Sequence, residues 1–357
     1  MKILIYFNNP LQPQLSPSST IGWGATEDYT INIAKGLNDI GHTVDVFNWI
    51  KEDLTDDIRY FGKDTMFNEQ THYDVVIGIM FIHFLKEITG LCTWDKSFLW
   101  ISMPTIHEGW PQDYITQLSP NWINELSTYN FNGIVCNCKW HQKRIEEIVG
   151  NIPTYSIPPG ISRDLFPTTE KQKIKNSFIW TSDPSRGLKS LLFNWGRITK
   201  LIPDATLKIF YPHYVDITKL EKPELYDWLS EADNHSNITL VGNVEKSVLY
   251  NAMAESEYWV YTTAFEETYC TTAMEMMHSK VKIITSMLAA LPEVIGTYGV
   301  YRDFQNKVGC SQCDISEDVI SAIEEYNSNS KLEDAYNWSK KNTYKHRVYE
   351  WNKLISK

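Results

Sequence analysis

The chain has 357 residues, a length that predicts two domains, each with its own hydrophobic core. Hydrophobic residues make up 43% of the sequence and charged residues 22%, as in an ordinary globular protein. The formal net charge of −11 argues against nucleic acid as a partner, because phosphate binding needs a basic surface. No apolar run approaches the roughly 18 residues of a membrane-spanning helix, so no transmembrane segment is expected.

The cysteines show no disulfide framework; they stand at positions 92, 136, 138, 270, 310 and 313. Cys310 and Cys313 form a C-x-x-C pair, but a zinc site needs a second ligand pair close by. We therefore expect two free thiols in a loop and no metal site. The opening stretch at 2–6 is too short for a signal-peptide core, so the expected location is the cytoplasm.

The amino-terminal segment predicts a strand, a glycine-containing loop, a helix and a second strand. The strands are expected at 2–7 and 43–47. Gly24 ends a Gly-x-Gly segment between them, which could bring a phosphate or sugar close to the backbone, or make a tight turn with no ligand. Glu27 stands where the dinucleotide-binding fingerprint has its third glycine, so that fingerprint is excluded.

The alternation of strands and helices starts again after a proline-rich stretch at 153–166. Further strands are expected at 75–78, 98–102 and 133–137 before this stretch, and at 177–181, 206–211, 238–241, 258–261 and 281–285 after it. We predict an α/β protein in which two Rossmann-like, doubly wound domains face a cleft. The expected divisions are 1–158, 159–335, and a C-terminal helix at 336–357 that packs back on the first domain.

Two glutamates follow the strand expected at 258–261. Glu267 lies in the loop, and Glu275 lies about two turns along the helix that follows. The N–H groups at such a helix start form an anion site. Carboxylates on both sides of an anion site suit a nucleotide-diphospho-sugar, which has hydroxyls at both ends and phosphates between them. The alternative is two solvated glutamates on a surface helix.

Five segments, in this order along the chain, resemble those of one enzyme family. Gly24-Ala25-Thr26-Glu27 resembles a Gly-Gly-x-Glu motif, and Ile157-Pro158-Pro159-Gly160-Ile161 an Ile-Pro-Asn-Gly-Val linker. Residues 182–188 are similar to Ser-x-Pro-x-Arg-Gly-Leu. Residues 267–275 match a glutamate, seven residues, glutamate signature, and residues 291–293 match a Leu-Pro-Glu turn. Together they resemble the retaining glycosyltransferases of family 4, which have the GT-B fold.

This resemblance implies roles for particular residues. Glu275 would accept hydrogen bonds from the donor ribose, and Glu267 would hold hydroxyls of the transferred sugar. Arg186 would stabilise the departing diphosphate, because its guanidinium suits phosphate, and Lys189 is a weaker second candidate. The backbone at Cys270, Thr271 and Thr272 would complete the anion site. Asn243 and Val244 match the region that lines the base, and Gly24 belongs to the donor site.

Several positions depart from the family pattern. A second basic residue is common where this chain has Thr181, and Cys270 replaces a glycine. Many relatives have a histidine against the sugar where this chain has Ser102. His107, in the loop that follows, is our candidate to replace it as a catalytic residue.

The sequence therefore predicts an enzyme that moves a sugar, with retention of configuration, from a UDP- or GDP-sugar to a hydroxyl of a glycan or another acceptor. No cofactor or metal ion is expected. Two alternatives stay open. One is an epimerase or hydrolase of nucleotide-sugars on the same fold, and the other is an inactive nucleotide-sugar-binding subunit.

Overall fold

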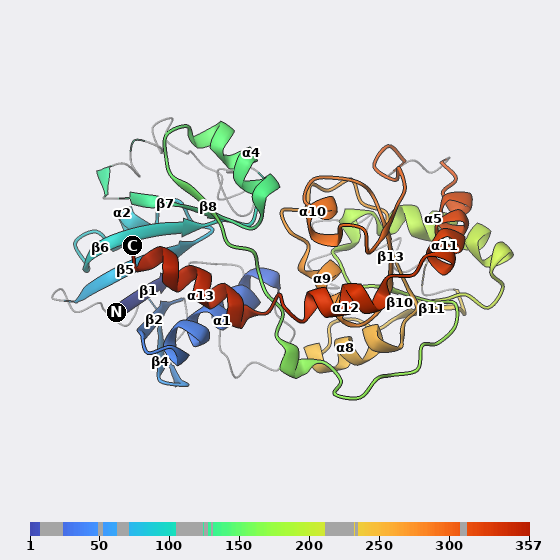
Figure 1. Ribbon diagram of the computed structural model, residues 1–357, viewed down its shortest axis with the longest axis horizontal. Coiled ribbons are helices and arrows are strands. Elements are labelled where there is room, and N and C mark those ends of the chain that lie inside the picture. The colour runs from blue at the N-terminus through green and yellow to red at the C-terminus, as the bar shows by residue number, and fades with distance from the viewer. Residues whose placement is uncertain are drawn as a thin grey trace. The chain divides into compact units, whose positions relative to one another are not determined.

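The computed structural model describes residues 1–7, 24–48, 53–62, 71–104, 124, 128–129, 131–210, 232, 235–307 and 313–357 (Figure 1). These residues divide into two compact units. The first runs to Gly160 and also takes in Thr343–Lys357, and the second is Ile161–Asn342.

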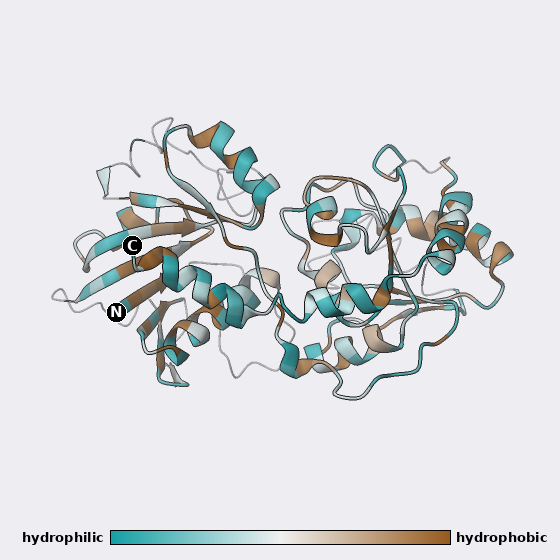
Figure 2. Ribbon diagram, viewed as in Figure 1, coloured by the Kyte–Doolittle hydropathy of each residue, from teal (hydrophilic) through white to brown (hydrophobic). Residues whose placement is uncertain are grey.

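The first unit is built on a sheet of eight described strands in the order β3-β4-β2-β1-β5-β6-β7-β8. All neighbours are parallel except β3 and β4, a hairpin that the sequence pattern did not predict. The strands are β1 Lys2–Tyr6, β2 Thr43–Phe47, β3 Asp53–Thr55, β4 Ile58–Phe61, β5 His72–Ile79, β6 Thr93–Trp100, β7 Phe131–Cys136 and β8 Thr154–Ser156. Figure 2 shows that hydrophobic residues concentrate on its central strands, and residues 3–5 are fully buried.

Helices cover both faces of this sheet. The described helices are α1 Ala25–Asp39, α2 Phe84–Ile88, α4 Lys139–Val149 and α13 Tyr344–Ile355. One apolar cluster joins the sheet to α1 and α13, and another joins it to α2 and α4. The C-terminal helix α13 lies beside α1 (Figure 1), where Trp351 Nε1 donates a hydrogen bond to the Tyr29 hydroxyl.

The C-terminal stretch differs from the single helix expected at 336–357. The structure divides it into α12, Leu332–Ser339, in the second unit and α13 in the first. Thr343 has an extended backbone, with φ −98° and ψ 161°, which starts a new helix rather than continuing the old one. The Asn342 side chain donates to the Trp338 carbonyl at the end of α12.

Gly36 lies where α1 and α13 touch, and we expect Gly36→Ala to destabilise the first unit by about 1–3 kcal/mol. A Cβ at this position would stand 2.1 Å from Cγ2 of Val348, so the helices would have to separate. Gly196, in the helix α5 Leu188–Leu201, is the matched control because a Cβ there meets nothing within 4 Å. Gly196→Ala should stabilise by about 0.5–1 kcal/mol. Urea denaturation measures both, and a neutral or stabilising Gly36→Ala would contradict this packing.

The second unit is built on six described parallel strands in the order β11-β10-β9-β12-β13-β14. They are β9 Ser177–Trp180, β10 Thr206–Ile209, β11 Ile238–Leu240, β12 Tyr258–Tyr261, β13 Lys282–Thr285 and β14 Val300–Tyr301. The helices are η2 Arg163–Leu165, η3 Pro184–Arg186, α5 Leu188–Leu201, α8 Lys246–Glu255, α9 Thr271–His278, α10 Leu291–Ile295, α11 Ser316–Ser328 and α12 Leu332–Ser339. The expected class, α/β with two doubly wound Rossmann-like domains, is confirmed.

The order of these strands places a topological switch point between β9 and β12. The chain runs from β9 outward through β10 and β11, and then returns to form β12 on the other side of β9. The loops that leave the carboxyl ends of β9 and β12 therefore turn in opposite directions. In open α/β sheets this is where ligands bind.

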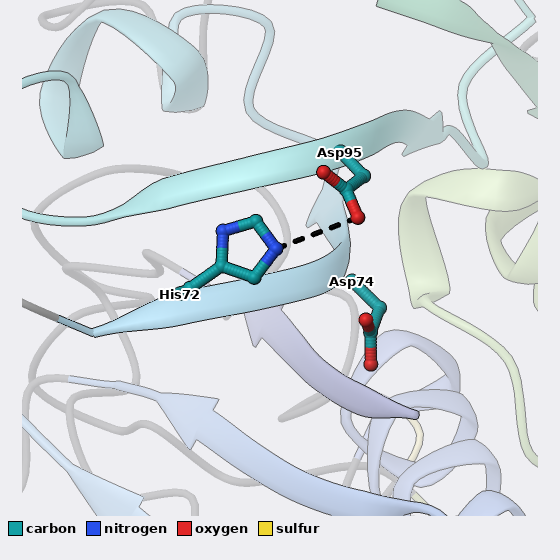
Figure 3. Close-up of side chains that lie close together, drawn as sticks. All are labelled: His72, Asp74 and Asp95. Atoms are coloured by element: carbon teal, nitrogen blue, oxygen red, sulfur yellow. Dashed lines mark ion pairs between the residues drawn. The ribbon is translucent and has the colours of Figure 1, made fainter.

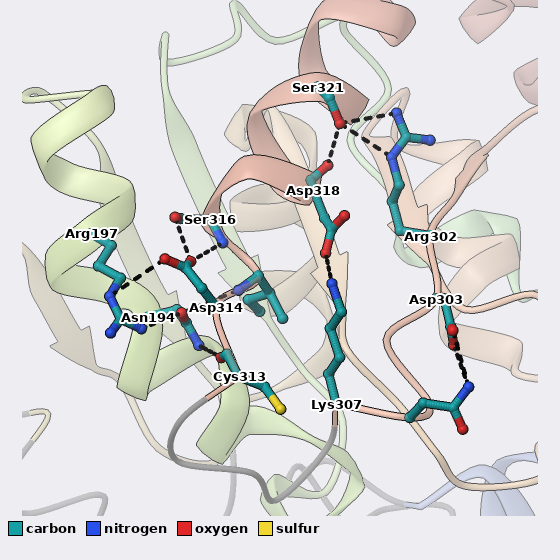
Figure 4. A network of polar contacts seen from close by, with 12 residues as sticks. Asn194, Arg197, Arg302, Asp303, Lys307, Cys313, Asp314, Ser316, Asp318 and Ser321 are labelled. Atoms are coloured by element: carbon teal, nitrogen blue, oxygen red, sulfur yellow. Dashed lines mark hydrogen bonds and ion pairs between the residues drawn. The ribbon is translucent and has the colours of Figure 1, made fainter.

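Asn194 of α5 fixes the segment that leads into α11 (Figure 4). Its amide group donates to the Cys313 carbonyl and accepts from the Ile315 N–H. Cys313 itself is disulfide-bonded, so the expectation of a free thiol at this position is wrong. The sequence pattern alone does not reveal whether a cysteine is oxidised. Cys310 lies outside the described residues.

Candidate functional site

The switch point brings Arg186 and Glu267 together from positions 81 residues apart. Arg186 ends η3, directly after β9, and Glu267 lies in the loop after β12. The distance from Arg186 Nη1 to Glu267 Oε1 is 2.8 Å. Glu267 is only 6% exposed, whereas the Arg186 side chain is 36% exposed. The pair is thus a half-buried cation against a buried carboxylate at the ligand-binding edge of the sheet.

Glu267 and one further group, the Phe265 ring, hold the Arg186 side chain in its charged form and in place. Burial acts to lower the pKa of the guanidinium, but the acidic neighbours together, with Glu267 the strongest of them, outweigh burial and raise the pKa above its ordinary value. The guanidinium carbon also lies 4.2 Å from the ring centroid of Phe265, a cation–π contact. A fixed cation with several N–H donors can bind a phosphate group.

Tyr261, the last residue of β12, is a third member of this cluster. Its buried hydroxyl donates a hydrogen bond to Glu267 Oε1 at 2.5 Å. Burial raises the pKa of Tyr261, and the charge of Glu267 raises it further, so the phenol stays protonated and acts as a donor. From the sequence pattern, Tyr261 was expected only as a strand residue.

The helix α9 begins beside this cluster. Its first residues, Thr271 and Thr272, are half-buried, and the N–H groups of a first helical turn lack partners within the helix. Cys270 precedes them with φ 63° and ψ 75°, a left-handed conformation that glycine adopts without strain. This conformation explains why a glycine was expected here. Burial raises the pKa of the Cys270 thiol, and the charge of Glu267 adds to the effect, so the sulfur is a neutral thiol.

Glu275 lies further along α9 and is also buried, at 8% exposure. It accepts a hydrogen bond of 2.7 Å from the hydroxyl of Tyr250 on α8. The Tyr250 ring stacks on Phe166 with a centroid distance of 3.9 Å. The alternative of two solvated surface glutamates is therefore wrong, because both Glu267 and Glu275 are buried and hydrogen-bonded.

The other predicted residues lie around the site or outside it. Lys189, in the first turn of α5, has its ammonium 5.2 Å from the Phe193 ring centroid. Asn243 and Val244 follow β11 at the same carboxyl edge of the sheet. Gly24 belongs to the first unit, where it precedes α1. His107 lies outside the described residues, and its role stays a prediction.

Tyr261 and Tyr250 are the functional residues that the sequence analysis missed. Each donates its hydroxyl hydrogen to one of the two glutamates. A signal existed for both, since Tyr261 ends the strand before the glutamate segment and Tyr250 lies in the helix before that strand. That signal does not distinguish a tyrosine packed in the core from one whose hydroxyl reaches a carboxylate.

One group of described residues could offer ligand atoms to a metal ion, and it lies elsewhere. His72, Asp74 and Asp95 stand at the amino-terminal ends of β5 and β6 (Figure 3), with their ligand atoms within 4.8 Å of one another. His72 Nε2 forms an exposed pair with Asp95 at 3.4 Å, and Asp74 accepts from the Lys2 N–H. An ion pair and a hydrogen bond therefore explain why these side chains lie together. They lie at the edge of the sheet opposite to its ligand-binding edge.

The helix that carries Glu275 ends at His278, and we expect this histidine to make the fold sensitive to acid. Burial lowers the pKa of His278 to about 4 from 6.5. Between these values the unfolded chain binds a proton that the folded chain does not, so stability falls as the pH drops from 6.5 to 4. Urea denaturation at several pH values should show this loss, with a limiting slope of about 1.4 kcal/mol per pH unit for this group. His278→Gln should remove this contribution to the slope. An unchanged slope in the variant would contradict the assignment of the acid sensitivity to His278.

Comparison with known proteins gives a fold but no sequence family. No family model matches the chain, and neither does any curated protein sequence. Solved structures do match. Sucrose-phosphate synthase from Thermosynechococcus elongatus is 12% identical, with a TM-score of 0.66 over 99% of this chain and 96% of that one. HepE from Anabaena, in complex with UDP and glucose, is 13% identical, with a TM-score of 0.67 over 100% and 99%. The chain has the GT-B fold.

A third neighbour agrees with this assignment. AviGT4, a glycosyltransferase involved in avilamycin A biosynthesis, is 13% identical, with a TM-score of 0.62 over 99% of this chain and 97% of that one. The cluster of Arg186 and Glu267 thus lies in the second domain of a GT-B fold. Within the described residues, no helix is both long and apolar enough to cross a membrane.

Proposed function

We propose that this protein is a retaining glycosyltransferase of family 4, which transfers a sugar from a UDP- or GDP-sugar to a hydroxyl of a glycan or another acceptor. One observation carries the proposal. Arg186 and Glu267 form an ion pair of a half-buried cation and a buried carboxylate where β9 and β12 end, next to the start of α9. A cation and free helix N–H groups suit a diphosphate, and a buried carboxylate suits sugar hydroxyls. HepE has the same fold and binds UDP and glucose, which supports this choice of donor.

Each end of the donor has a candidate partner. Glu275, held by Tyr250, would accept hydrogen bonds from the ribose hydroxyls. Asn243 and Val244 would line the base. Gly24 of the first unit would let the backbone approach the phosphate or sugar, since it has no side chain.

Groups of the protein would neutralise the charge of the diphosphate. Arg186 supplies a fixed cation, and the N–H groups at Cys270, Thr271 and Thr272 supply dipoles. Lys189 is a further cation on α5. Because these groups stabilise the leaving diphosphate, we infer that transfer needs no metal ion, and EDTA should leave the rate unchanged.

The reaction would proceed on one face of the sugar. The bond from the sugar carbon to the diphosphate oxygen breaks, the acceptor oxygen bonds to that carbon, and the acceptor proton passes to the diphosphate. Glu267 would hold the sugar hydroxyls during this step. Cys270 supplies no nucleophile, since burial keeps its thiol protonated. His107 remains the predicted partner of the sugar, and the cytoplasm remains the predicted location.

Nucleotide binding gives the first test. UDP, GDP, ADP and their common sugars, added without metal, should include one base that stabilises the protein. A ligand at about 100 times its dissociation constant adds roughly 2.7 kcal/mol of stability. Glu275→Ala should abolish the shift, because the ribose loses its carboxylate. If no nucleotide shifts the melting temperature, the proposed function fails although the fold stands.

A second candidate is a subunit that binds the nucleotide-sugar without transferring it. The observation in its favour is Thr181, which stands where relatives commonly have a second basic residue. Its hydroxyl is buried and has no hydrogen-bond partner among the described residues. Such a subunit would pass the binding test but release no nucleoside diphosphate when acceptors are added.

A further inference from the structure

The two hydrogen bonds to the Glu267 side chain converge on a single oxygen. Arg186 Nη1 donates to Oε1 at 2.8 Å, and the Tyr261 hydroxyl donates to the same atom at 2.5 Å. Within the part of the chain that the structure describes, no hydrogen bond reaches Oε2. A carboxylate has acceptor capacity on both oxygens, so Oε2 keeps its capacity for a ligand.

Tyr261 is the more rigid of the two donors. It ends β12, its side chain is fully buried, and its ring stacks on Trp259 at a centroid distance of 4.7 Å. The Trp180 ring of β9 lies 5.5 Å away on the neighbouring strand. Packing on two adjacent strands therefore fixes the direction of the phenol, as a precise binding site requires.

Arg186 alone cannot fix the orientation of the Glu267 carboxylate. Its side chain is 36% exposed, and under the proposed function its guanidinium also meets the diphosphate. When the guanidinium donates to phosphate oxygens as well as to Glu267, the phenol is the donor that serves Oε1 alone. The carboxylate then keeps its plane, and Oε2 keeps its direction.

We propose that Tyr261 is a positioning residue: it holds Oε1 of Glu267 so that Oε2 faces a hydroxyl of the transferred sugar. This inference rests on the proposed function. Tyr261 touches neither sugar nor phosphate and acts through Glu267. The reacting groups tolerate little misplacement, so loss of this bond slows the transfer step more than it weakens donor binding.

The test compares Tyr261→Phe with Tyr258→Phe. Both variants lose one hydroxyl from the same strand, but Tyr258 is at its start, where the hydroxyl lies 3.4 Å from Lys282 Nζ. We expect Tyr261→Phe to lower kcat about 10-fold and to leave the calorimetric affinity for the nucleoside diphosphate within about twofold. Tyr258→Phe should change neither. Nucleoside diphosphate affinity also reports that the second unit is folded.

A double-mutant cycle separates positioning from general support of the fold. If Tyr261 acts through Glu267, then adding Tyr261→Phe to Glu267→Gln should cost less than about a further twofold in kcat. Any of three results would overturn the inference. Tyr261→Phe could lower kcat equally in the wild-type and Glu267→Gln backgrounds, it could leave kcat unchanged, or it could weaken the affinity for the nucleoside diphosphate. Failure of the proposed function looks different, because the wild-type protein would then transfer no sugar to any acceptor.

Discussion

Glu267→Gln should lower kcat for sugar transfer about 100-fold or more, and the affinity for the nucleoside diphosphate should stay within twofold. The amide keeps the shape of the side chain but loses the charge that faces the sugar hydroxyls. Arg186 and Tyr261 can still donate to its oxygen, so the anion site next to it should keep its structure. Steady-state kinetics and calorimetry on the same preparation measure the two quantities.

Glu266→Gln is the matched control, since it removes one negative charge from the adjacent position of the same loop. It should leave kcat within about threefold, because no contact with the sugar or the diphosphate is assigned to Glu266 and the loss of one charge changes the surrounding field only modestly. Near-normal transfer by Glu267→Gln would show that its carboxylate does not serve the sugar. A loss equal in both variants would place the effect in the loop as a whole.

Arg186→Ala should destabilise the second unit by about 3–5 kcal/mol, because it leaves the buried carboxylate of Glu267 without its counter-charge. It should also weaken donor binding, since the diphosphate loses its cation. Urea denaturation measures the first effect and calorimetry with the nucleoside diphosphate the second. Adding Glu267→Gln should restore part of the lost stability, because the unpaired charge is then gone.

Arg197→Ala supplies the control for charge removal on a nearby helix. Arg197 of α5 pairs with Asp314 at 3.6 Å (Figure 4), and both side chains are about half exposed, at 47% and 51%. Its loss should cost no more than about 1 kcal/mol, because water screens exposed pairs. If Arg186→Ala costs no more than Arg197→Ala, Arg186 is not the counter-charge that stabilises the buried carboxylate of Glu267.

The sequence predicted many strands of the two sheets and the local place of both glutamates. An apolar strand, a loop with Glu267 and a helix with Glu275 are all local features, and β12 and α9 form there. The order of strands within each sheet depends on pairing over long distances, and the hairpin of β3 and β4 was missed.

The surroundings of the glutamates could not be read in the same way. Whether Glu267 is buried depends on other segments, such as the loop after β13, where the Ala290 N–H donates to the Glu267 carbonyl. Tyr250 reaches Glu275 from another helix, 25 residues away. The break between α12 and α13 also depends on which unit each helix packs against. These are properties of packing, which a linear pattern does not contain.

The most direct test of the account is the transfer reaction itself. Nucleotide-sugars with the base found by the binding panel would be incubated with and without a set of glycan acceptors. Proton NMR would follow the anomeric configuration of the product while the release of nucleoside diphosphate is measured. We predict release only when an acceptor is present, with the anomeric configuration of the donor kept in the product. Conversion of the donor without any acceptor, or an inverted product, would contradict the account.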